Sequence, residues 1–131
     1  MKILQPADWP RPRGYSNGIA VSGTTVYLAG IVGWNSEEIF EAHDLPGQAR
    51  QAFRNIVALL EEADAEPQHL VRLTWYVRDL NEYRASLAEI GGFYREILGR
   101  HYPVMALVEV SGLLEPDARL EIEATAVIPN P

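Results

Sequence analysis

Three glutamates near the end of the chain have the type and spacing that acid–base chemistry needs. Glu109 lies in one run of alternating apolar residues, and Glu121 and Glu123 lie in the next. Side chains two residues apart in a strand share a face, so Glu109 shares one with Met105 and Leu107. Solvent faces seldom combine such apolar side chains with so many acids, whereas a face covered by another subunit does. Crowded carboxylates raise one another's pKa, which suits a general acid or base, so this mixed face is the candidate site.

Ion pairing is the structural alternative for these carboxylates. Networks of ion pairs also perturb pKa values, so an acidic cluster alone does not establish catalysis. The sequence leaves open whether Glu109, Glu121 and Glu123 are catalytic or only ion-paired. The possible partners are Arg72, Arg78 and Arg119.

A β-hairpin over residues 103–127 is predicted to carry these side chains. Residues 114–117 separate the two alternating runs, where Pro116 presets φ and Asp117 can bond its own backbone. One set of alternate residues in each strand is expected to face the core. The members are Val104, Ala106, Val108 and Val110 in the first strand, and Leu120, Ile122, Ala124 and Ala126 in the second.

Upstream patterns predict three further strands, a fourth short one and two helices. Alternation favours strands at 18–22 and 25–30, joined at Gly23-Thr24, a short one at 36–40 and another at 70–77. A helix at 45–63 has Asp44 as its N-cap, Pro46 in its first turn and Gln48 among its solvent-side residues. A second helix at 81–98 contains Gly91-Gly92, which favours close packing on the sheet or a kink. The proline-rich segment 1–14 is expected to be an irregular arm.

Together these elements predict one α+β domain over residues 1–131, with a mixed sheet and two helices packed on one face. Two helices cover only one face of a sheet of four to six strands, so the other face needs a cover. Self-association is the economical way to supply it.

Composition restricts the kinds of ligand and partner that the chain is expected to bind. The net charge is −7 and Lys2 is the only lysine, which disfavours nucleic acid because phosphate contacts need clustered basic residues. There are no cysteines, and the three histidines lack ligand spacing, so no metal site is expected. No apolar run reaches membrane-spanning length and the first residues do not resemble a signal peptide, so we expect a cytoplasmic protein that does not bind membranes.

Five segments, in order along nearly the whole chain, resemble the RidA (YjgF, L-PSP endoribonuclease-like) family. This resemblance implies a chorismate-mutase-like fold, a homotrimer, and a site between subunits at which several members hydrolyse reactive enamines and imines. The segments are residues 14–18 (GYSNG), 26–30 (VYLAG), 48–52 (QARQA), 76–81 (YVRDLN), and 108–110 (VEV) with 120–124 (LEIEA).

At the family's site positions this chain keeps Tyr15, Gly30 and Glu121. The resemblance therefore implies Glu121 and Tyr15 as catalytic residues. Met105 stands where the family's arginine holds the substrate carboxylate, and methionine cannot make that bidentate contact. The implied substrate-binding residues are Ala29, Gly30, Trp34, Leu87, Met105 and Leu107, in which Ala29, Leu87 and Leu107 replace a serine, an asparagine and a cysteine.

Two details of this site stay open. Trp34 either caps the pocket or packs against the body. Arg11 or Arg13 of the arm is a candidate replacement for the missing anchor, although loop arginines are usually solvated.

Two functions from different classes follow. The first is a hydrolase or deaminase for an enamine, an imine or a related small metabolite, with little activity on 2-aminoacrylate. Hydrolysis needs only a positioned water and a proton shuttle, so no cofactor is expected either. The second is a catalytically silent trimer that binds an apolar small molecule or a protein.

Overall fold

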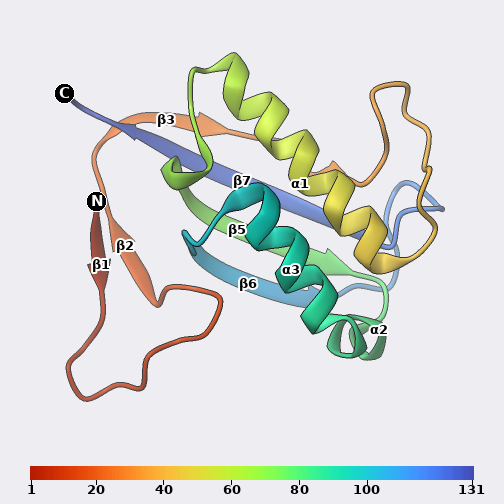
Figure 1. The fold of residues 1–131 in the computed structure, drawn as a ribbon, viewed down its shortest axis with the longest axis horizontal. Coiled ribbons are helices and arrows are strands. Elements are labelled where there is room, and N and C mark those ends of the chain that lie inside the picture. Colours follow the sequence, from red (N-terminus) through yellow and green to blue (C-terminus); the bar gives the residue numbers. More distant parts are fainter.

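The computed structural model describes residues 1–131. Seven strands, three α-helices and one 3₁₀ turn follow each other along the chain (Figure 1). They are β1 (Lys2–Leu4), β2 (Gly18–Ala20), β3 (Gly23–Tyr27), β4 (Ile31–Val32), α1 (Leu45–Glu62), η1 (Pro67–His69), β5 (Leu70–Val77), α2 (Leu80–Ala85), α3 (Leu87–Leu98), β6 (Val104–Glu109) and β7 (Leu120–Pro129).

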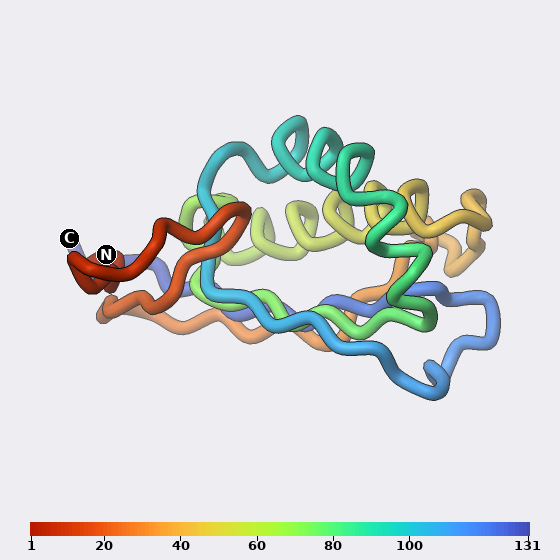
Figure 2. The backbone as a smooth tube through the Cα atoms, turned by 90° about the horizontal axis from the view of Figure 1, so that it is seen from below, coloured from red at the N-terminus to blue at the C-terminus, as the bar shows by residue number.

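A five-stranded mixed sheet forms the centre of the molecule. Its order is β3-β7-β5-β6, with β4 also paired to β7; only the β5–β6 pair is parallel. The helices form a single layer on one side of this sheet, and its other side is bare (Figure 2). The predicted α+β class, the mixed sheet and the one-sided helix layer are confirmed.

The core fills the space between the helices and the sheet. Phe53 of α1 is central, because its ring meets the Trp75 ring edge-on at 5.6 Å and the Tyr94 ring at 5.5 Å. Such edge-to-face pairs add to the stabilisation from burial. Other fully buried members of this core are Leu45, Ile56, Leu60, Leu70, Leu73, Val77, Leu120 and Ile122.

The predicted C-terminal hairpin is wrong, because β6 and β7 are not partners. β5 lies between them, parallel to β6 and antiparallel to β7. The chain passes from β5 through α2 and α3 before it enters β6, and such a crossover returns a strand parallel to the one it left. Pro116 and Asp117 therefore lie in a loop that crosses over the end of β5.

The faces of β6 are also the reverse of the prediction. Met105, Leu107 and Glu109 lie opposite Leu73, Trp75 and Val77, which face the helices. The remaining residues of this strand, Val104, Ala106 and Val108, therefore lie on the helix-free face. Both faces of β6 are rich in apolar side chains, so alternation could not decide which face is inside. In β7 the predicted core set is correct.

The strands near the N-terminus pair differently from the prediction. β2 pairs with β1 rather than with β3, and β3 pairs with β7. The predicted arm thus begins with a three-residue strand, while residues 5–14 hold neither helix nor strand. Residues 36–40 form no strand either, because the Asn35 side chain accepts backbone hydrogen bonds from Glu37 and Ile39 and closes a turn.

The helix predicted at 81–98 is divided at Ser86 into α2 and α3. Asp79 caps α2 by accepting hydrogen bonds from the amides of Asn81 and Glu82. Gly91 and Gly92 lie within the continuous helix α3, so the break does not occur at the glycines.

Candidate functional site

A cavity of about 440 Å³ lies between α3 and the β5–β6 edge of the sheet. Loop residues Arg13–Tyr15 form part of its wall. Nine of its 13 lining residues are hydrophobic, and none is acidic. The other lining residues are Trp75, Tyr83, Leu87, Ile90, Gly91, Tyr94, Arg95, Tyr102, Met105 and Leu107.

Four of the predicted site residues meet in this cavity, although they come from three parts of the chain. Tyr15 comes from the N-terminal loop, Leu87 begins α3, and Met105 and Leu107 lie on β6. The reversed faces of β6 are the reason, because they turn both side chains toward the helices. Tyr15 and Met105 also line a neighbouring groove with Arg72 and Thr74.

Ser16 fixes the loop that carries Tyr15. Its amide donates to the carbonyl of Pro103 at 3.1 Å, and its Oγ donates to the carbonyl of Tyr102 at 2.5 Å. A bridge with Val104 continues this pairing onto β6. Gly14 has φ +77, a conformation that L side chains rarely adopt, and it turns the chain just before Tyr15. Tyr15 is therefore held beside the edge strand.

Glu121 and Gly30, two further predicted site residues, lie together on the opposite face of the sheet. Glu121 is paired with Tyr76, whose neighbour Trp75 faces the cavity. A Cβ added to Gly30 would lie 2.3 Å from Glu121 Oε2, so the carboxylate packs directly against the glycine. Ala29, next in the chain, is exposed. Within one chain, the Glu121–Gly30 contact is separated from the Met105 cavity by the sheet.

Trp34 belongs to neither group. Its ring lies 5.7 Å from the ring of Phe40, and its carbonyl accepts a hydrogen bond from Asn55 on α1. Trp34 thus packs against its own chain here, and its place at the substrate pocket stays a prediction.

The three glutamates do not form one cluster. Glu109 lies on the helix side and accepts a hydrogen bond from the Leu80 amide at 3.0 Å, which supports the start of α2. Glu121 and Glu123 lie on the helix-free face, where Glu123 is 3.5 Å from the Tyr76 hydroxyl. The predicted ion pairs of these acids with Arg72, Arg78 and Arg119 are absent; the two ion pairs present are Arg50–Glu96 and Arg119–Glu82.

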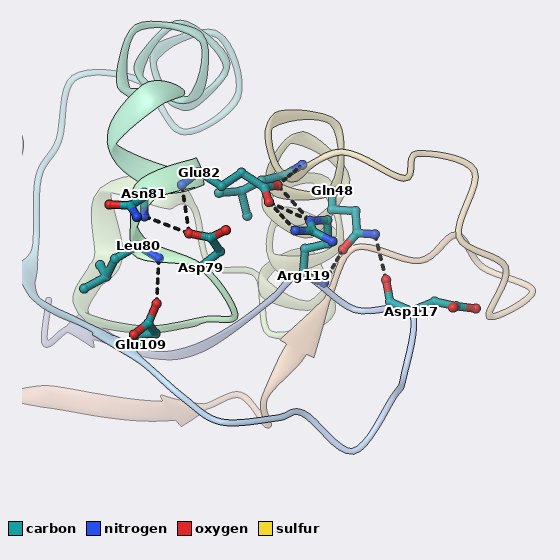
Figure 3. A network of polar contacts seen from close by, with 9 residues as sticks. Gln48, Asp79, Leu80, Asn81, Glu82, Glu109, Asp117 and Arg119 are labelled. Atoms are coloured by element: carbon teal, nitrogen blue, oxygen red, sulfur yellow. Dashed lines mark hydrogen bonds and ion pairs between the residues drawn. The ribbon is translucent and has the colours of Figure 1, made fainter.

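Arg119 instead belongs to a network that joins α1, α2 and the start of β7 (Figure 3). Its guanidinium donates to the Glu82 carboxylate through both Nε and Nη2. Nε lies 2.7 Å from Oε1 and 2.9 Å from Oε2. The hydrogen bond to Glu82 raises the pKa of Arg119. Gln48, expected on the solvent side, is fully buried and bonds the backbone at Ala42, Asp117 and Arg119. This network is structural.

Two tyrosines of the cavity wall, Tyr83 and Tyr94, come from α2 and α3. Burial raises the pKa of Tyr83, and burial followed by the neighbouring Tyr102 raises the pKa of Tyr94. Both phenols therefore stay neutral near pH 7. The Tyr94 hydroxyl donates to the His101 carbonyl at 2.7 Å, and its ring stacks on Tyr102 at 5.3 Å. These groups shape the wall, and they supply neutral hydroxyls rather than a base.

No three His, Asp or Glu side chains are grouped so that they could hold a metal ion. None of the helices has the length and apolar character needed to span a membrane.

Comparison with known proteins places the chain in a family. A family model described as Endoribonuclease L-PSP matches residues 9–128. A RutC family protein of Synechocystis is 32% identical over 133 residues, covering 99% of this chain and 98% of the relative. A 2-iminobutanoate/2-iminopropanoate deaminase of Dermatophagoides farinae is 33% identical over 130 residues, with 97% and 96% covered.

Among solved structures, a Rid family protein of unknown function from Yersinia pestis matches with a TM-score of 0.84. It is 31% identical, and the match covers 97% of this chain and 98% of that one. Sequence and fold thus agree over nearly the full length. The chain belongs to the RidA/YjgF family, whose model carries the description Endoribonuclease L-PSP.

Proposed function

We propose that this protein hydrolyses an imine or enamine whose body is larger and more apolar than those of 2-iminopropanoate and 2-iminobutanoate. Relatives named 2-iminobutanoate/2-iminopropanoate deaminases support the reaction class. The observation that carries the change of substrate is the cavity, where Leu87, Met105 and Leu107 lie together in a mostly hydrophobic wall. An apolar wall favours an apolar substrate body by removing it from water.

The site of this proposal lies between copies of the chain. Glu121 is on the sheet face opposite the cavity, so a single chain cannot bring the two together. The helix-free face carries Tyr27 and Val108 with 79% and 46% of their surfaces exposed, which favours a cover of protein. A homotrimer, as the family resemblance implies, would bring Glu121 of one copy to the cavity of the next.

Glu121 acts in this mechanism as the proton carrier. A water oxygen adds to the C=N carbon while the Glu121 carboxylate accepts a proton from the water. The proton passes to the nitrogen, which gives a carbinolamine. The hydroxyl proton of the carbinolamine then passes to the nitrogen as the C–N bond breaks, which forms the carbonyl product and releases ammonia. One water is consumed and there is no net change of oxidation state. Positioned general acid–base catalysis of this kind contributes roughly 10²–10⁴-fold. Tyr15, held at the cavity edge, is the hydrogen-bond partner for the substrate.

Replacing Glu121 tests the reaction. The probe is 2-imino-3-phenylpropanoate, formed in the assay by an amino acid oxidase acting on L-phenylalanine, and the readout is its hydrolysis rate above the spontaneous rate. We expect Glu121→Gln to lower that rate by about 10²-fold or more, with unchanged assembly. Glu123→Gln, two residues along the same strand, is the control and should stay active. Equal loss in both variants, or none in either, would contradict the role of Glu121.

Co-expression tests the location between copies. The first partner is Glu121→Gln; the second is Leu87→Trp, which obstructs the cavity mouth at a half-exposed position. Each variant alone should be inactive. In random mixed trimers about one quarter of the sites combine an intact cavity with an intact Glu121, so activity should reappear. Continued inactivity of the mixed assemblies would place both halves in one chain and refute the arrangement.

A silent binding protein is the second candidate. It is favoured by the same cavity, because the resemblance assigns a serine, an asparagine, an arginine and a cysteine to positions that hold Ala29, Leu87, Met105 and Leu107 here. In that case ligand binding survives Glu121→Gln and no imine is hydrolysed faster than in buffer. A cytoplasmic location and the lack of nucleic-acid binding remain predictions from composition.

A further inference from the structure

Arg13 and Arg95 are the two charged residues that line the cavity. Neither takes part in an ion pair, although the chain has 18 acidic residues against 11 basic ones. The cavity wall thus has two guanidinium groups and no carboxylate, although the chain as a whole is acidic. Guanidinium groups suit carboxylates because their planar donors match the two carboxylate oxygens.

Arg95 lines the cavity together with Gly91, which lies one turn earlier in α3. A Cβ added to Gly91 would lie 3.3 Å from Arg95 Nη1, so the guanidinium lies back over the helix at this position. The glycine is about 1 kcal/mol less favourable in a helix than alanine. Its lack of a side chain leaves space beside the guanidinium at the cavity wall.

Arg13 is placed by the folded N-terminal arm. The Gln5 side chain donates to the carbonyls of Trp9 and Pro10 and accepts a hydrogen bond from Asn17 at 3.0 Å. Ser16 bonds the arm to the start of β6. These contacts hold both ends of the loop that carries Arg13. Arg11, two residues earlier, does not line the cavity.

We propose that Arg13 and Arg95 together bind the carboxylate of a substrate with an aromatic body, in place of the anchor that Met105 cannot supply. The ring lies between Tyr15, Leu87 and Met105. This inference rests on the proposed function, because it assigns the substrate class of the same cavity.

Size and chemistry of the wall support an aromatic body. A volume of about 440 Å³ lies within the usual range for small-molecule sites and exceeds the needs of a three-carbon acid. Tyrosine rings offer edge and face contacts to an aromatic ligand, and a thioether such as that of Met105 makes favourable contacts with aromatic rings.

Binding of three stable probes tests the inference. We expect 3-phenylpropanoate to bind about tenfold or more tightly than its neutral amide, 3-phenylpropanamide, by isothermal titration calorimetry. Propanoate, which lacks the ring, should bind more weakly than both. Arg13→Gln and Arg95→Gln should each weaken binding of the acid several-fold and leave the amide unchanged. Arg11→Gln is the matched control and should bind like the parent chain.

Two outcomes would overturn the inference: equal affinity for the acid and the amide, or the same loss in the Arg11 control. A second variant, Gly91→Ala, requires a shift of only a few tenths of an ångström in the Arg95 guanidinium, so it should weaken binding of the acid less than Arg95→Gln does. Failure of this inference can be distinguished from failure of the proposed function. Tight, arginine-dependent binding of the acid without imine hydrolysis would leave the anion site intact and refute catalysis. Hydrolysis without charge discrimination would retain catalysis and refute the anchor.

Discussion

Arginines at two places in this molecule differ in whether a carboxylate partner is present. At the start of β7, Arg119 is paired with Glu82 and joined to Gln48, and the network connects three elements of the fold. At the cavity, Arg13 and Arg95 have no carboxylate partner. A charge with its partners already in place contributes to stability, while a charge without one is available to a ligand.

The glutamates repeat this contrast. Glu109 supports the amide of Leu80 on the helix side of the sheet, whereas Glu121 lies against Gly30 on the uncovered side. The two have the same appearance in the sequence. What separates them is the face of the sheet that each occupies. We therefore expect changes near Glu121 to alter turnover and changes in the Arg119 network to alter stability.

The largest effect is expected at Gly30. A Cβ here would lie 2.3 Å from Glu121 Oε2, so Gly30→Ala must move the carboxylate that we propose as the proton carrier. Because a displacement of about 1 Å in a catalytic group can cost roughly 10²-fold, we expect a loss of that size in imine hydrolysis. Steady-state kinetics with the phenylalanine-derived imine measures it.

Gly92→Ala is the matched control for that substitution. No atom lies within 4 Å of the added Cβ, and the residue is inside helix α3. We expect unchanged turnover and a gain of about 0.5–1 kcal/mol in the free energy of unfolding, because alanine is the better helix former. If Gly30→Ala proves as harmless to turnover as Gly92→Ala, Glu121 does not need its present position.

Met105→Arg is expected to have the next largest effect. It restores a guanidinium at the position where the resemblance assigns the carboxylate anchor. Hydrolysis of 2-iminopropanoate should then rise by about 10²-fold, since a charge-assisted bidentate contact sheltered from water is worth a few kcal/mol. Met105→Lys, which has the charge but lacks the planar donors, should recover less. No gain with either variant would show that other residues limit this activity.

The sequence predicted some elements better than others, for physical reasons. The strand at Leu70–Val77 was predicted with its observed bounds, because its buried residues alternate with polar ones such as Arg72 and Thr74. The faces of β6 were reversed because both are apolar. Strand pairing failed where it depends on distant parts of the chain: a hairpin needs only a turn, whereas the observed pairing depends on the crossover through α3.

The residues of the candidate site also differ in how far the sequence could identify them. Tyr15, Leu87 and Met105, which the resemblance assigns to one site, line the same cavity, but the resemblance could not show that Glu121 lies on the other face of the same chain. Arg95 was missed because an arginine on a helix normally points to solvent. A signal was present, since Gly91 stands one turn before it, but a glycine in a helix has several explanations.

Substitutions in the Arg119 network should change stability and leave turnover intact. Glu82→Gln removes the charge that pairs with Arg119 and weakens the contact with the Leu45 amide at the start of α1. We expect a loss of about 1–2 kcal/mol in the free energy of unfolding, limited because Arg119 is partly exposed to solvent. Urea denaturation measures it. A large fall in turnover of the folded variant would mean that the network also shapes the site.

The smallest effect expected is an alkaline loss of stability that depends on Tyr94. Its pKa is raised in the folded protein above the usual 10.0, so the unfolded chain loses this proton first as the pH rises. The unfolded state then binds fewer protons than the folded one. The contribution of the Tyr94 proton to the free energy of unfolding is therefore complete below pH 10.0. Above this pH it is lost, at up to about 1.4 kcal/mol per pH unit.

Tyr94→Phe should flatten this slope, as measured by urea denaturation between about pH 8 and about pH 11. The variant also loses the hydrogen bond to the His101 carbonyl, which lowers stability at every pH and leaves the slope unaffected. Tyr27→Phe, at a side chain with 79% of its surface exposed, is the control and should retain the parent slope. If Tyr94→Phe keeps that slope too, the proton that leaves on unfolding belongs to another buried group, and Tyr83 in the same cavity wall is the next to test.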